Sequence, residues 1–236
     1  MVAVRAGGRE LPVSEWDLPD PRNADPTTDL VAIGADLSPA TVLQGYARGL
    51  FPMHVSSDHP DEAPVLGWWS PNPRGILPIT SMRVTRSLRK SRQRFSTTLD
   101  RSFVDVMKKC QRPQEEGQWI TTEFIDTYTE LHRQGFAHSV EVWNDVGELA
   151  GGLYGIELGG LFAGESMFHV ERDASKVALL RLVEELGSCP GDRILDVQWR
   201  TDHLASLGVI EIPRSDYLDR LAVVLDTIPC LGPSSA

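Results

Sequence analysis

Residues 139–168 read SVEVWNDVGELAGGLYGIELGGLFAGESMF. Apolar segments of strand length alternate here with short turns at 145–148 and 158–160. Segments of this length separated by turn residues are typical of antiparallel strands that follow one another along the chain. The sequence therefore predicts an antiparallel meander, with strands at about 139–144, 149–156 and 161–168.

Helix signals lie on both sides of this meander. Ser38 followed by Pro39 is typical of a helix start, because Ser caps free N–H groups and Pro fits the first turn. Gly49 suits the end of that helix. Capping residues, among them Thr121 or Thr122 for one helix and Thr201 for another, and apolar spacing predict the remaining elements. These are helices at about 100–110, 122–134, 174–186, 201–207 and 215–225, and short strands at 194–199 and 209–212.

The amino-acid composition changes near residue 80, since 11 of the 16 prolines precede that point. Residues 1–30 are expected to be an extended lead-in, and Phe51-Pro52 and residues 68–74 to be loops. We expect a mixed α/β fold with a small N-terminal domain at 1–80 and a larger α+β domain with a mixed sheet at 81–236.

Composition narrows the class of protein. The 236 residues are 41% hydrophobic and 24% charged, which excludes a disordered or fibrous protein. The formal net charge of −10 excludes a wholly basic nucleic-acid-binding surface, so a polyanion would need a local patch. Cys110, Cys189 and Cys230 are too few and too scattered for a disulfide framework or a zinc site. The N-terminus lacks the apolar core of a signal peptide, so we expect a cytoplasmic protein without membrane contact.

One local basic patch is present. Residues 83–94 read RVTRSLRKSRQR, with six basic residues and no acid, whereas the rest of the chain has a net charge of −16. At helical spacing Arg86, Arg89 and Lys90 share a face that fits a phosphate backbone. The alternative is a solvated helix whose charges pair with acidic neighbours. We favour anion binding, because the segment holds no acid of its own.

The segment ILDVQW at 194–199 places polar groups in a strand otherwise suited to burial. Period-two alternation predicts Asp196 and Gln198 on one side and Trp199 with the apolar residues on the other. Buried polar groups cost free energy unless they are hydrogen-bonded. In one interpretation Asp196 accepts from the amide NH₂ of Gln198, whose carbonyl oxygen then faces a substrate N–H. In the other, they are a structural polar pair at a sheet edge.

Glu165 raises a similar question. In LFAGESMF, residues 161–168, it shares a predicted strand face with Ala163 and Met167. A carboxylate at such a position is best explained by a cationic partner. That partner is either part of a ligand or one of the protein's own arginines, and the sequence leaves both interpretations open.

Other motifs are weak or missing. The glycines at 151–160 fit hairpin packing better than a GxGxxG phosphate loop. The six histidines show no metal-ligand spacing, and no G-x-S-x-G motif of a serine hydrolase is present. We interpret His203, in the first turn of a predicted helix, as structural. Trp68, Trp69 and Trp119 lie in expected loops and offer flat surfaces for a nucleobase.

Eight motifs occur in a fixed order along the chain. They are IGADLS at 33–38, YARGLFP at 46–52, WWSPNPR at 68–74, GQWIT at 117–121, HSVEVW at 138–143, GESMF at 164–168, DVQ at 196–198 and DHLASLG at 202–208. Together they resemble the leucyl/phenylalanyl-tRNA–protein transferase family, over about residues 30–220. The number of motifs and their order argue strongly against a chance match.

The resemblance implies a fold and a reaction. The family's catalytic domain has the acetyltransferase-like (GNAT) fold and follows a small α/β N-terminal domain. The family moves Leu or Phe, and also Met, from its tRNA to the N-terminal α-amine of proteins that begin with Arg or Lys. This transfer marks those proteins for degradation in the bacterial N-degron (N-end rule) pathway. By resemblance we expect a monomer whose partners are aminoacyl-tRNA and such acceptor proteins, and we expect no metal, no ATP and no other cofactor.

The resemblance also implies roles for particular residues. Asp196 and Gln198 match the family's catalytic pair, with Gln198 facing the attacking amine and Asp196 polarising it. Glu165 matches the acid that binds the acceptor's basic side chain. The residues that match the aminoacyl-adenosine site are Tyr46, Trp119, Tyr128, Leu153, Phe162 and Met167. Those that fall in the basic cluster for the tRNA acceptor end are Arg86, Arg89, Lys90 and Arg94.

Two residues depart from the family pattern. Met53 stands where the family usually has Trp, and Thr201 where it commonly has Asn. The departures concern donor preference and fine positioning, because a flexible thioether replaces a stacking surface.

Two alternative functions remain. The first is an acyl-CoA-dependent acetyltransferase of the same fold, which needs a glycine-rich loop before a helix to bind the pyrophosphate. Residues 169–174, HVERDA, precede a predicted helix and contain no glycine, which disfavours this alternative. A tRNA-binding module without activity fits the basic patch, but it leaves the placement of Glu165, Asp196 and Gln198 unexplained.

Overall fold

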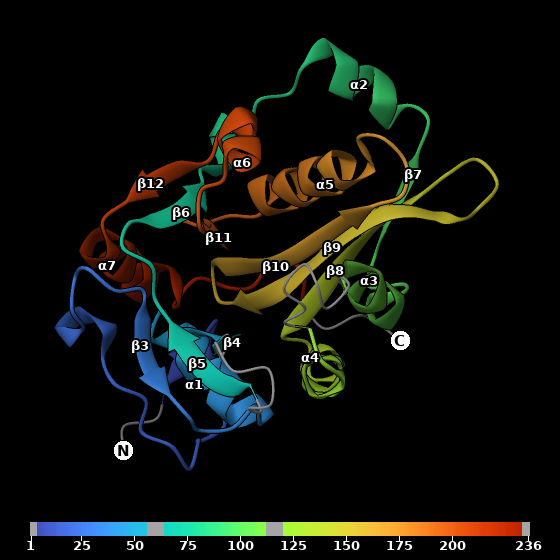
Figure 1. Cartoon of the computed structure of the whole chain (residues 1–236). Helices are drawn as coiled ribbons and strands as arrows, with labels where there is room; N and C mark the ends of the chain where they lie inside the picture. The colour runs from blue at the N-terminus through green and yellow to red at the C-terminus, as the bar shows by residue number, and fades with distance from the viewer. Residues whose placement is uncertain (1–3, 56–63, 112–119, 233–236) are drawn as a thin grey trace.

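A seven-stranded sheet forms the centre of the computed structural model, which describes residues 4–55, 64–111 and 120–232. Its order is β12-β6-β11-β10-β9-β8-β7 (Figure 1). The strands are β6 (Arg74–Leu77), β7 (Ser96–Leu99), β8 (Ala137–Trp143), β9 (Leu149–Leu158), β10 (Leu161–His169), β11 (Ile194–Gln198) and β12 (Ile210–Ile212). Only β10 and β11 pair in parallel; the other neighbours are antiparallel. The predicted meander and the mixed α/β class are confirmed.

Helices cover both faces of this sheet. α5 (Ala174–Ser188) packs on β8, β9 and β10, and Figure 1 shows it between the sheet and α2 (Arg86–Arg92). α3 (Phe103–Cys110) and α4 (Thr122–Arg133) pack on strands of the same sheet and contribute to a different apolar core from that of α5. Within the described residues, no helix is both long and apolar enough to cross a membrane.

A smaller sheet belongs to the N-terminal part of the chain. Its order is β3-β5-β4, and α1 packs beside β4. The elements of this part are β1 (Arg5–Ala6), β2 (Arg9–Glu10), the 3₁₀ helix η1 (Pro21–Asn23), β3 (Leu30–Ile33), α1 (Pro39–Ala47), β4 (Phe51–Val55) and β5 (Val65–Trp69). The prediction of loops is therefore wrong at 51–52, which lie in β4, and at 68–69 and 74, which lie in β5 and β6, whereas residues 70–73 form a loop as predicted. Pro52 is accommodated because β4 is an edge strand.

Trp68 does not offer a surface for a nucleobase. Its side chain is fully buried in the core, and its Nε1 donates to the backbone oxygen of Gly34 at 3.0 Å. Trp69 is half-buried and donates in the same way to Met53 at 3.0 Å.

Three predicted helix starts are confirmed by their caps. The side chains of Ser38, Thr121 and Thr201 accept backbone N–H groups at the beginning of α1, α4 and α6 (Asp202–Leu207). The remaining elements are the 3₁₀ helix η2 (Ile79–Ser81) and α7 (Arg214–Val224). The domain boundary at residue 80 stays a prediction. Because β6 is a strand of the large sheet, sheet membership alone would divide the chain before residue 74.

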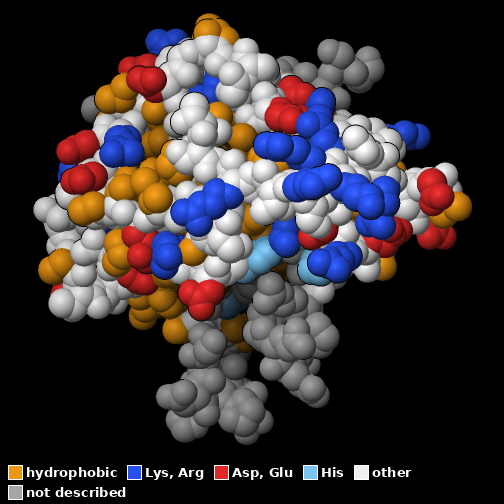
Figure 2. Space-filling view, turned by 90° about the horizontal axis from the view of Figure 1, so that it is seen from above, with side chains coloured by type: hydrophobic (Ala, Val, Ile, Leu, Met, Phe, Trp, Pro, Cys, Tyr) orange, Lys and Arg blue, Asp and Glu red, His pale blue; other side chains and the backbone are white. Residues whose placement is uncertain are grey.

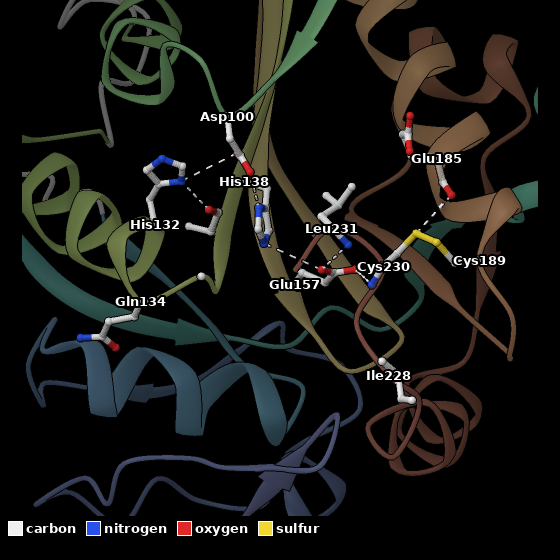
Figure 3. A network of polar contacts seen from close by, with 12 residues as sticks. Asp100, His132, Gln134, His138, Glu157, Glu185, Cys189, Ile228, Cys230 and Leu231 are labelled. Carbon is white, nitrogen blue, oxygen red and sulfur yellow. Dashed lines mark hydrogen bonds and ion pairs between the residues drawn. A yellow bond between two sulfur atoms is a disulfide. The ribbon is translucent and has the colours of Figure 1, made fainter. Parts of the chain in front are cut away.

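A polar network joins distant parts of the chain (Figure 3). A disulfide links Cys189, which follows α5, to Cys230 near the C-terminus. Glu157 accepts the backbone N–H of Cys230 at 2.6 Å, and the buried His138 lies between Glu157 and Asp100. The expectation that the cysteines form no disulfide framework is corrected to this one pair. Two cysteines separated by 41 residues carry no local signal for such a bond.

Candidate active site

The candidate site opens where the parallel strand pair ends. The ladder between β10 and β11 stops at Ala163 and Asp196. Just beyond this pair, each strand has a register irregularity against its other neighbour, around Glu165 in β10 and between Asp196 and Gln198 in β11. Glu165 and Gln198 thus follow the last paired residues, where the hydrogen-bonded ladder between the two strands has ended.

Two cavities meet at this opening. The smaller has a volume of about 120 Å³ and the larger about 440 Å³. Both are bordered by Glu165, Ser166, Met167, Val197, Gln198 and Leu204. A molecule with one end in each cavity would therefore have its central atoms beside Glu165 and Gln198. A hollow of about 760 Å³ lies elsewhere, between η2, the end of α5 and α7, and contains none of the predicted site residues.

Glu165 lies between the cavities with two tyrosine hydroxyls against it. Tyr46 donates to Oε1 at 2.6 Å, Tyr128 donates to Oε2 at 3.4 Å, and the two hydroxyls are 2.8 Å apart. Burial raises the pKa of Glu165 to about 8, although the hydrogen bond from Tyr46 opposes this. Burial also raises the pKa of both tyrosines well above the usual value, so their hydroxyls stay protonated. Within the described part of the chain no arginine or lysine forms a salt bridge with Glu165, so the interpretation that one of the protein's own arginines pairs with it finds no support there.

Gln198 faces Glu165 across the opening. Its Nε2 lies 3.5 Å from Oε1 of Glu165. The backbone of Gln198 has a φ of 57°, in the left-handed region that non-glycine residues rarely adopt. The backbone N–H of Trp199 donates to the oxygen of Val197 at 2.7 Å, which closes a three-residue turn around Gln198. A backbone turn, and not strand alternation, brings this amide to the cavities.

Asp196 is fully buried and borders neither cavity. Arg74 holds it with two hydrogen bonds, from Nε to Oδ1 at 2.9 Å and from Nη2 to Oδ2 at 2.6 Å. Tyr217 donates to Oδ2 at 2.9 Å, and the backbone N–H of Gln198 donates to Oδ1 at 2.9 Å. The interpretation that Asp196 holds the side-chain amide of Gln198 is therefore wrong, because Asp196 binds the backbone of Gln198 and the amide lies near Glu165.

The smaller cavity is apolar. Leu153 and Met167, both predicted for the aminoacyl site, border it. The other aliphatic residues of its wall are Leu179, Leu182, Leu195, Val197 and Leu204. Phe162 is fully buried and is not part of this lining. A hollow of this composition accommodates an apolar side chain and disfavours a charged one, whose burial would leave it without water or a partner.

The larger cavity has an aromatic wall. Phe51 and Trp199 border it beside Met53. Trp199 is 36% exposed, its Nε1 donates to Asp29 at 2.8 Å, and its ring meets that of Phe51 edge-on with 5.2 Å between centroids. The indole is thus held in place while part of its surface is open, which suits the stacking of a flat group. His203, interpreted as structural from the sequence, also borders this cavity and has an exposed side chain.

Basic side chains gather on the face around α2 (Figure 2). Exposed basic residues of the segment 83–94 that form no ion pair with a described acid are Arg83, Arg86, Arg89, Lys90 and Arg94. Arg92 pairs with an acid, Glu184 of α5. The alternative interpretation, in which acidic neighbours neutralise the basic helix, therefore applies to Arg92 but not to the other described basic residues of this segment. The segment begins beside α6, where the backbone N–H of Arg83 donates to Leu207 at 2.8 Å. Because the start of α6 borders the larger cavity and its six residues span about 9 Å, the basic face is close to the site.

The structure brings six of the predicted site residues together at the cavities. Those at the meeting of the cavities or in hydrogen-bond contact with it are Tyr46, Tyr128, Leu153, Glu165, Met167 and Gln198. Asp196 and Phe162 lie behind them, and Trp119 is outside the described residues.

Sequence reasoning missed Arg74, Tyr217 and the cavity position of Trp199. A signal for Arg74 was present, because a carboxylate in a strand as apolar as 194–199 needs a cationic partner. The sequence does not show which arginine supplies it, since Arg74 and Asp196 are 122 residues apart.

Comparison with known protein families gives independent evidence on the class of this protein. The family model described as leucyl/phenylalanyl-tRNA protein transferase matches residues 76–222, and the model of its N-terminal domain matches residues 35–72. A leucyl/phenylalanyl-tRNA–protein transferase of Anaeromyxobacter sp. (strain Fw109-5) is 48% identical over 90% of this chain and 88% of that protein. One of Psychrobacter cryohalolentis is 40% identical over 90% of this chain and 81% of that protein.

With its mixed sheet, its paired cavities and these relatives, the protein is a transferase enzyme. More specifically, the chain belongs to the leucyl/phenylalanyl-tRNA–protein transferase family.

Two solved structures have a partly similar chain path. One is L-PGS from Bacillus licheniformis, with a TM-score of 0.40 and 11% identity over 57% of this chain and 48% of that chain. The other is a tandem GNAT protein from the clavulanic acid biosynthesis pathway, with a TM-score of 0.36 and 17% identity over 76% of this chain and 59% of that chain. At these scores neither match supports a conclusion about activity.

Proposed function

We propose that this protein transfers Leu, Phe or Met from its tRNA to the N-terminal α-amine of proteins that begin with Arg or Lys. The modified protein is then degraded through the N-degron pathway, and the enzyme works in the cytoplasm as a monomer. The observation that carries the proposal is the meeting of an apolar cavity and a larger cavity beside Glu165 and Gln198.

The donor fits this pair of cavities. An aminoacyl-tRNA end has an apolar side chain on one side of its ester and a ribose with adenine on the other. With the side chain against Leu153 and Met167, and the adenosine in the larger cavity, the ester carbonyl lies at the shared border. Discrimination among Leu, Phe and Met is then loose, because one methylene group in an apolar pocket changes the free energy by only about 1–3 kcal/mol.

The acceptor fits the carboxyl group at the same border. Glu165 has hydrogen bonds from two tyrosines but no cationic partner in the described part of the chain. The side chain of an N-terminal Arg or Lys supplies that partner, and Tyr46 and Tyr128 hold the carboxyl group in position for it. Gln198, 3.5 Å from Glu165, is then next to the α-amine.

The reaction requires alignment more than activation. The neutral α-amine attacks the ester carbonyl carbon, a C–N bond forms, the ester C–O bond breaks, and the amine gives up a proton as the ribose hydroxyl leaves. Because the α-amine has a reference pKa of about 8, a useful neutral fraction exists near pH 7. Gln198 orients the amine as a neutral acceptor of its N–H, and such alignment can supply several kcal/mol of barrier reduction.

The basic face around α2 supports the tRNA in this proposal. We expect that changing Arg86, Arg89, Lys90 and Arg94 to Ala raises KM for aminoacyl-tRNA and weakens its salt dependence, by about 0.7–0.9 in the log–log slope per lost phosphate contact. Transfer from a minimal aminoacyl-adenosine donor should not change. Arg92→Ala is the matched control, because Glu184 already pairs with Arg92. An equal loss in Arg92→Ala, or a loss with the minimal donor, would contradict this role of the helix.

Trp199 supports the adenine in this proposal. We expect Trp199→Ala to raise KM for both aminoacyl-tRNA and aminoacyl-adenosine by about 5- to 100-fold, since stacking of one base contributes about 1–3 kcal/mol. Trp199→Phe should keep most of the affinity, because it preserves a flat face. Steady-state kinetics with the two donors measure this. If Trp199→Ala changes KM for neither donor, adenine does not stack on this indole.

One assay tests the proposed function. Purified protein is incubated with Leu-tRNA, Phe-tRNA or acetyl-CoA and a peptide with N-terminal Arg, and the peptide mass is measured. We expect addition of Leu or Phe, and no product when the α-amine is acetylated beforehand. Transfer from acetyl-CoA instead would identify an acetyltransferase, and tRNA binding without any product would identify a binding module.

A further inference from the structure

Arg74, Asp196 and Tyr217 form a buried polar cluster directly behind Gln198. Arg74 and Asp196 are 1% and 0% exposed, and Tyr217 is 1% exposed. Two hydrogen bonds join the guanidinium to the carboxylate, and the Tyr217 hydroxyl donates to the same carboxylate. None of these three side chains borders either cavity of the site. The cluster therefore cannot act on a substrate by direct contact there.

The contact of the cluster with the site is a backbone hydrogen bond. Oδ1 of Asp196 accepts the N–H of Gln198 at 2.9 Å. Gln198 is the central residue of the turn from Val197 to Trp199 and has a φ of 57°. A non-glycine residue in this conformation costs about 1–3 kcal/mol and persists only where its surroundings impose it. The Asp196 carboxylate is a group that imposes this turn.

Arg74 and Tyr217 fix the carboxylate from the other side. The fork of the guanidinium sets the plane of the Asp196 carboxylate, as bidentate pairs do. Arg74 lies against the ring of Tyr217 at 4.4 Å and that of Phe51 at 5.0 Å, and its Nη1 donates to Gly49 at 3.2 Å. It thereby couples the turn at Gln198 to β4, whose Phe51 borders the larger cavity.

We infer that Arg74 and Tyr217 are positioning residues for transfer, and that they and Asp196 act through the backbone of Gln198. In this arrangement Asp196 does not polarise the amine. It holds the Gln198 turn, so that the amide faces Glu165 and the cavities. The inference rests on the proposed function, since it concerns the step in which Gln198 orients the amine.

A cycle with Gln198→Ala tests this inference. We expect Arg74→Lys, which keeps the charge but loses the bidentate fork, to lower kcat by about 10-fold or more with both KM values within about 3-fold. Tyr217→Phe should lower kcat by less, about 3- to 10-fold, because Arg74 still holds the Asp196 carboxylate with two hydrogen bonds. In the Gln198→Ala background the same two changes should have no further effect on kcat, whereas the melting temperature should fall equally in both backgrounds.

Arg214→Lys is the matched control. Arg214 is also a buried arginine, but its guanidinium binds backbone oxygens of the N-terminal segment. The control should lower the melting temperature without changing kcat. A third variant, Arg74→Met, removes the cation of the buried Asp196 altogether. If this variant does not fold, Arg74→Lys and Tyr217→Phe still decide the outcome.

The inference is overturned if Arg74→Lys and Tyr217→Phe lower kcat by the same factor with and without Gln198, or if they leave kcat unchanged. The wild-type chain separates this from failure of the proposed function. If wild-type protein transfers no amino acid to the Arg peptide, the function itself is wrong. If it does, the cycle tests the positioning role alone.

Discussion

Glu165→Gln should lower kcat/KM for a peptide with N-terminal Arg by about 100-fold or more, mainly through KM. The physical reason is that the variant offers a neutral amide to the acceptor's cation, and loss of one partner of a buried charge pair costs about 2–5 kcal/mol. Steady-state kinetics with Leu-tRNA as donor measure the effect. The hydrogen bond from Tyr46 to this position can persist, because an amide oxygen also accepts.

The control for this variant is Glu211→Gln, an exposed acid on β12. Its kinetics should match those of the wild type. A second comparison uses a peptide with N-terminal Ala, on which wild type and Glu165→Gln should be equally poor. If Glu165→Gln keeps its KM for the Arg peptide, Glu165 does not bind the acceptor's basic side chain.

The pH dependence of this effect follows from the pKa of Glu165. Burial raises this pKa to about 8, so the carboxyl group is largely neutral at pH 6 and ionised above pH 8. The ratio of kcat/KM between wild type and Glu165→Gln removes the titration of the α-amine, which both share. We expect this ratio to rise about tenfold per pH unit from pH 6 to 7.5 and to level off above pH 8. A ratio that is constant over this range would contradict the account.

The raised pKa of Glu165 also predicts an effect on stability. An ordinary Glu carboxyl group titrates near pH 4.5, so between this pH and about 8 the native state binds more protons at Glu165 than the unfolded state does. The contribution of Glu165 to stability therefore falls as pH rises through this window, and Glu165→Gln removes this loss. The melting temperature of the variant relative to wild type should be higher at pH 8.5 than at pH 4.5, as thermal unfolding followed by circular dichroism would show.

Gln198→Ala should lower kcat by about 100-fold while both KM values stay within about 3-fold. Gln198 orients the amine at the moment of attack, and the loss of one aligned hydrogen-bond partner in a transition state costs about 10²–10³ in kcat. Single-turnover transfer from Leu-tRNA to the Arg peptide measures the chemical step directly.

The matched control is Gln134→Ala. This variant also removes a glutamine amide, but Gln134 lies at the end of α4 and borders neither cavity. It should not change kcat. Because Glu165→Gln acts on KM and Gln198→Ala on kcat, the two variants separate binding of the acceptor from alignment of its amine. A Gln198→Ala variant with normal kcat would show that the amine is aligned by another group.

Regular elements of the large sheet could be predicted from the sequence, because their signals are local. The meander at 139–168 follows from turn residues between apolar segments, and Thr121 and Thr201 cap the helices that they were expected to cap. The loop prediction failed at 51–52, 68–69 and 74, because the nearby prolines and aromatic residues suggest loops while pairing with distant strands makes these residues parts of β4, β5 and β6.

The site could be predicted only in part, because its geometry depends on irregular backbone. Alternation places Asp196 and Gln198 side by side, but the turn with φ of 57° at Gln198 separates their roles. The partners of Asp196, which are Arg74 and Tyr217, come from distant segments and carry no signal near residue 196. Glu165 was a candidate from the strand pattern as well as from the family resemblance, whereas Tyr46 and Tyr128 came from the resemblance alone, and the structure places the three side chains within 3.4 Å of one another.

The central claim is that one border between two cavities holds the ester of a charged tRNA against a free amino terminus. A crystal structure with an amide-linked phenylalanyl-adenosine, which cannot be cleaved, tests it most directly. The account predicts the phenylalanyl side chain in the smaller cavity near Leu153, the adenine on Trp199 and the carbonyl carbon between Glu165 and Gln198. A ligand bound in the hollow between η2, α5 and α7, or one with its carbonyl away from Gln198, would contradict it.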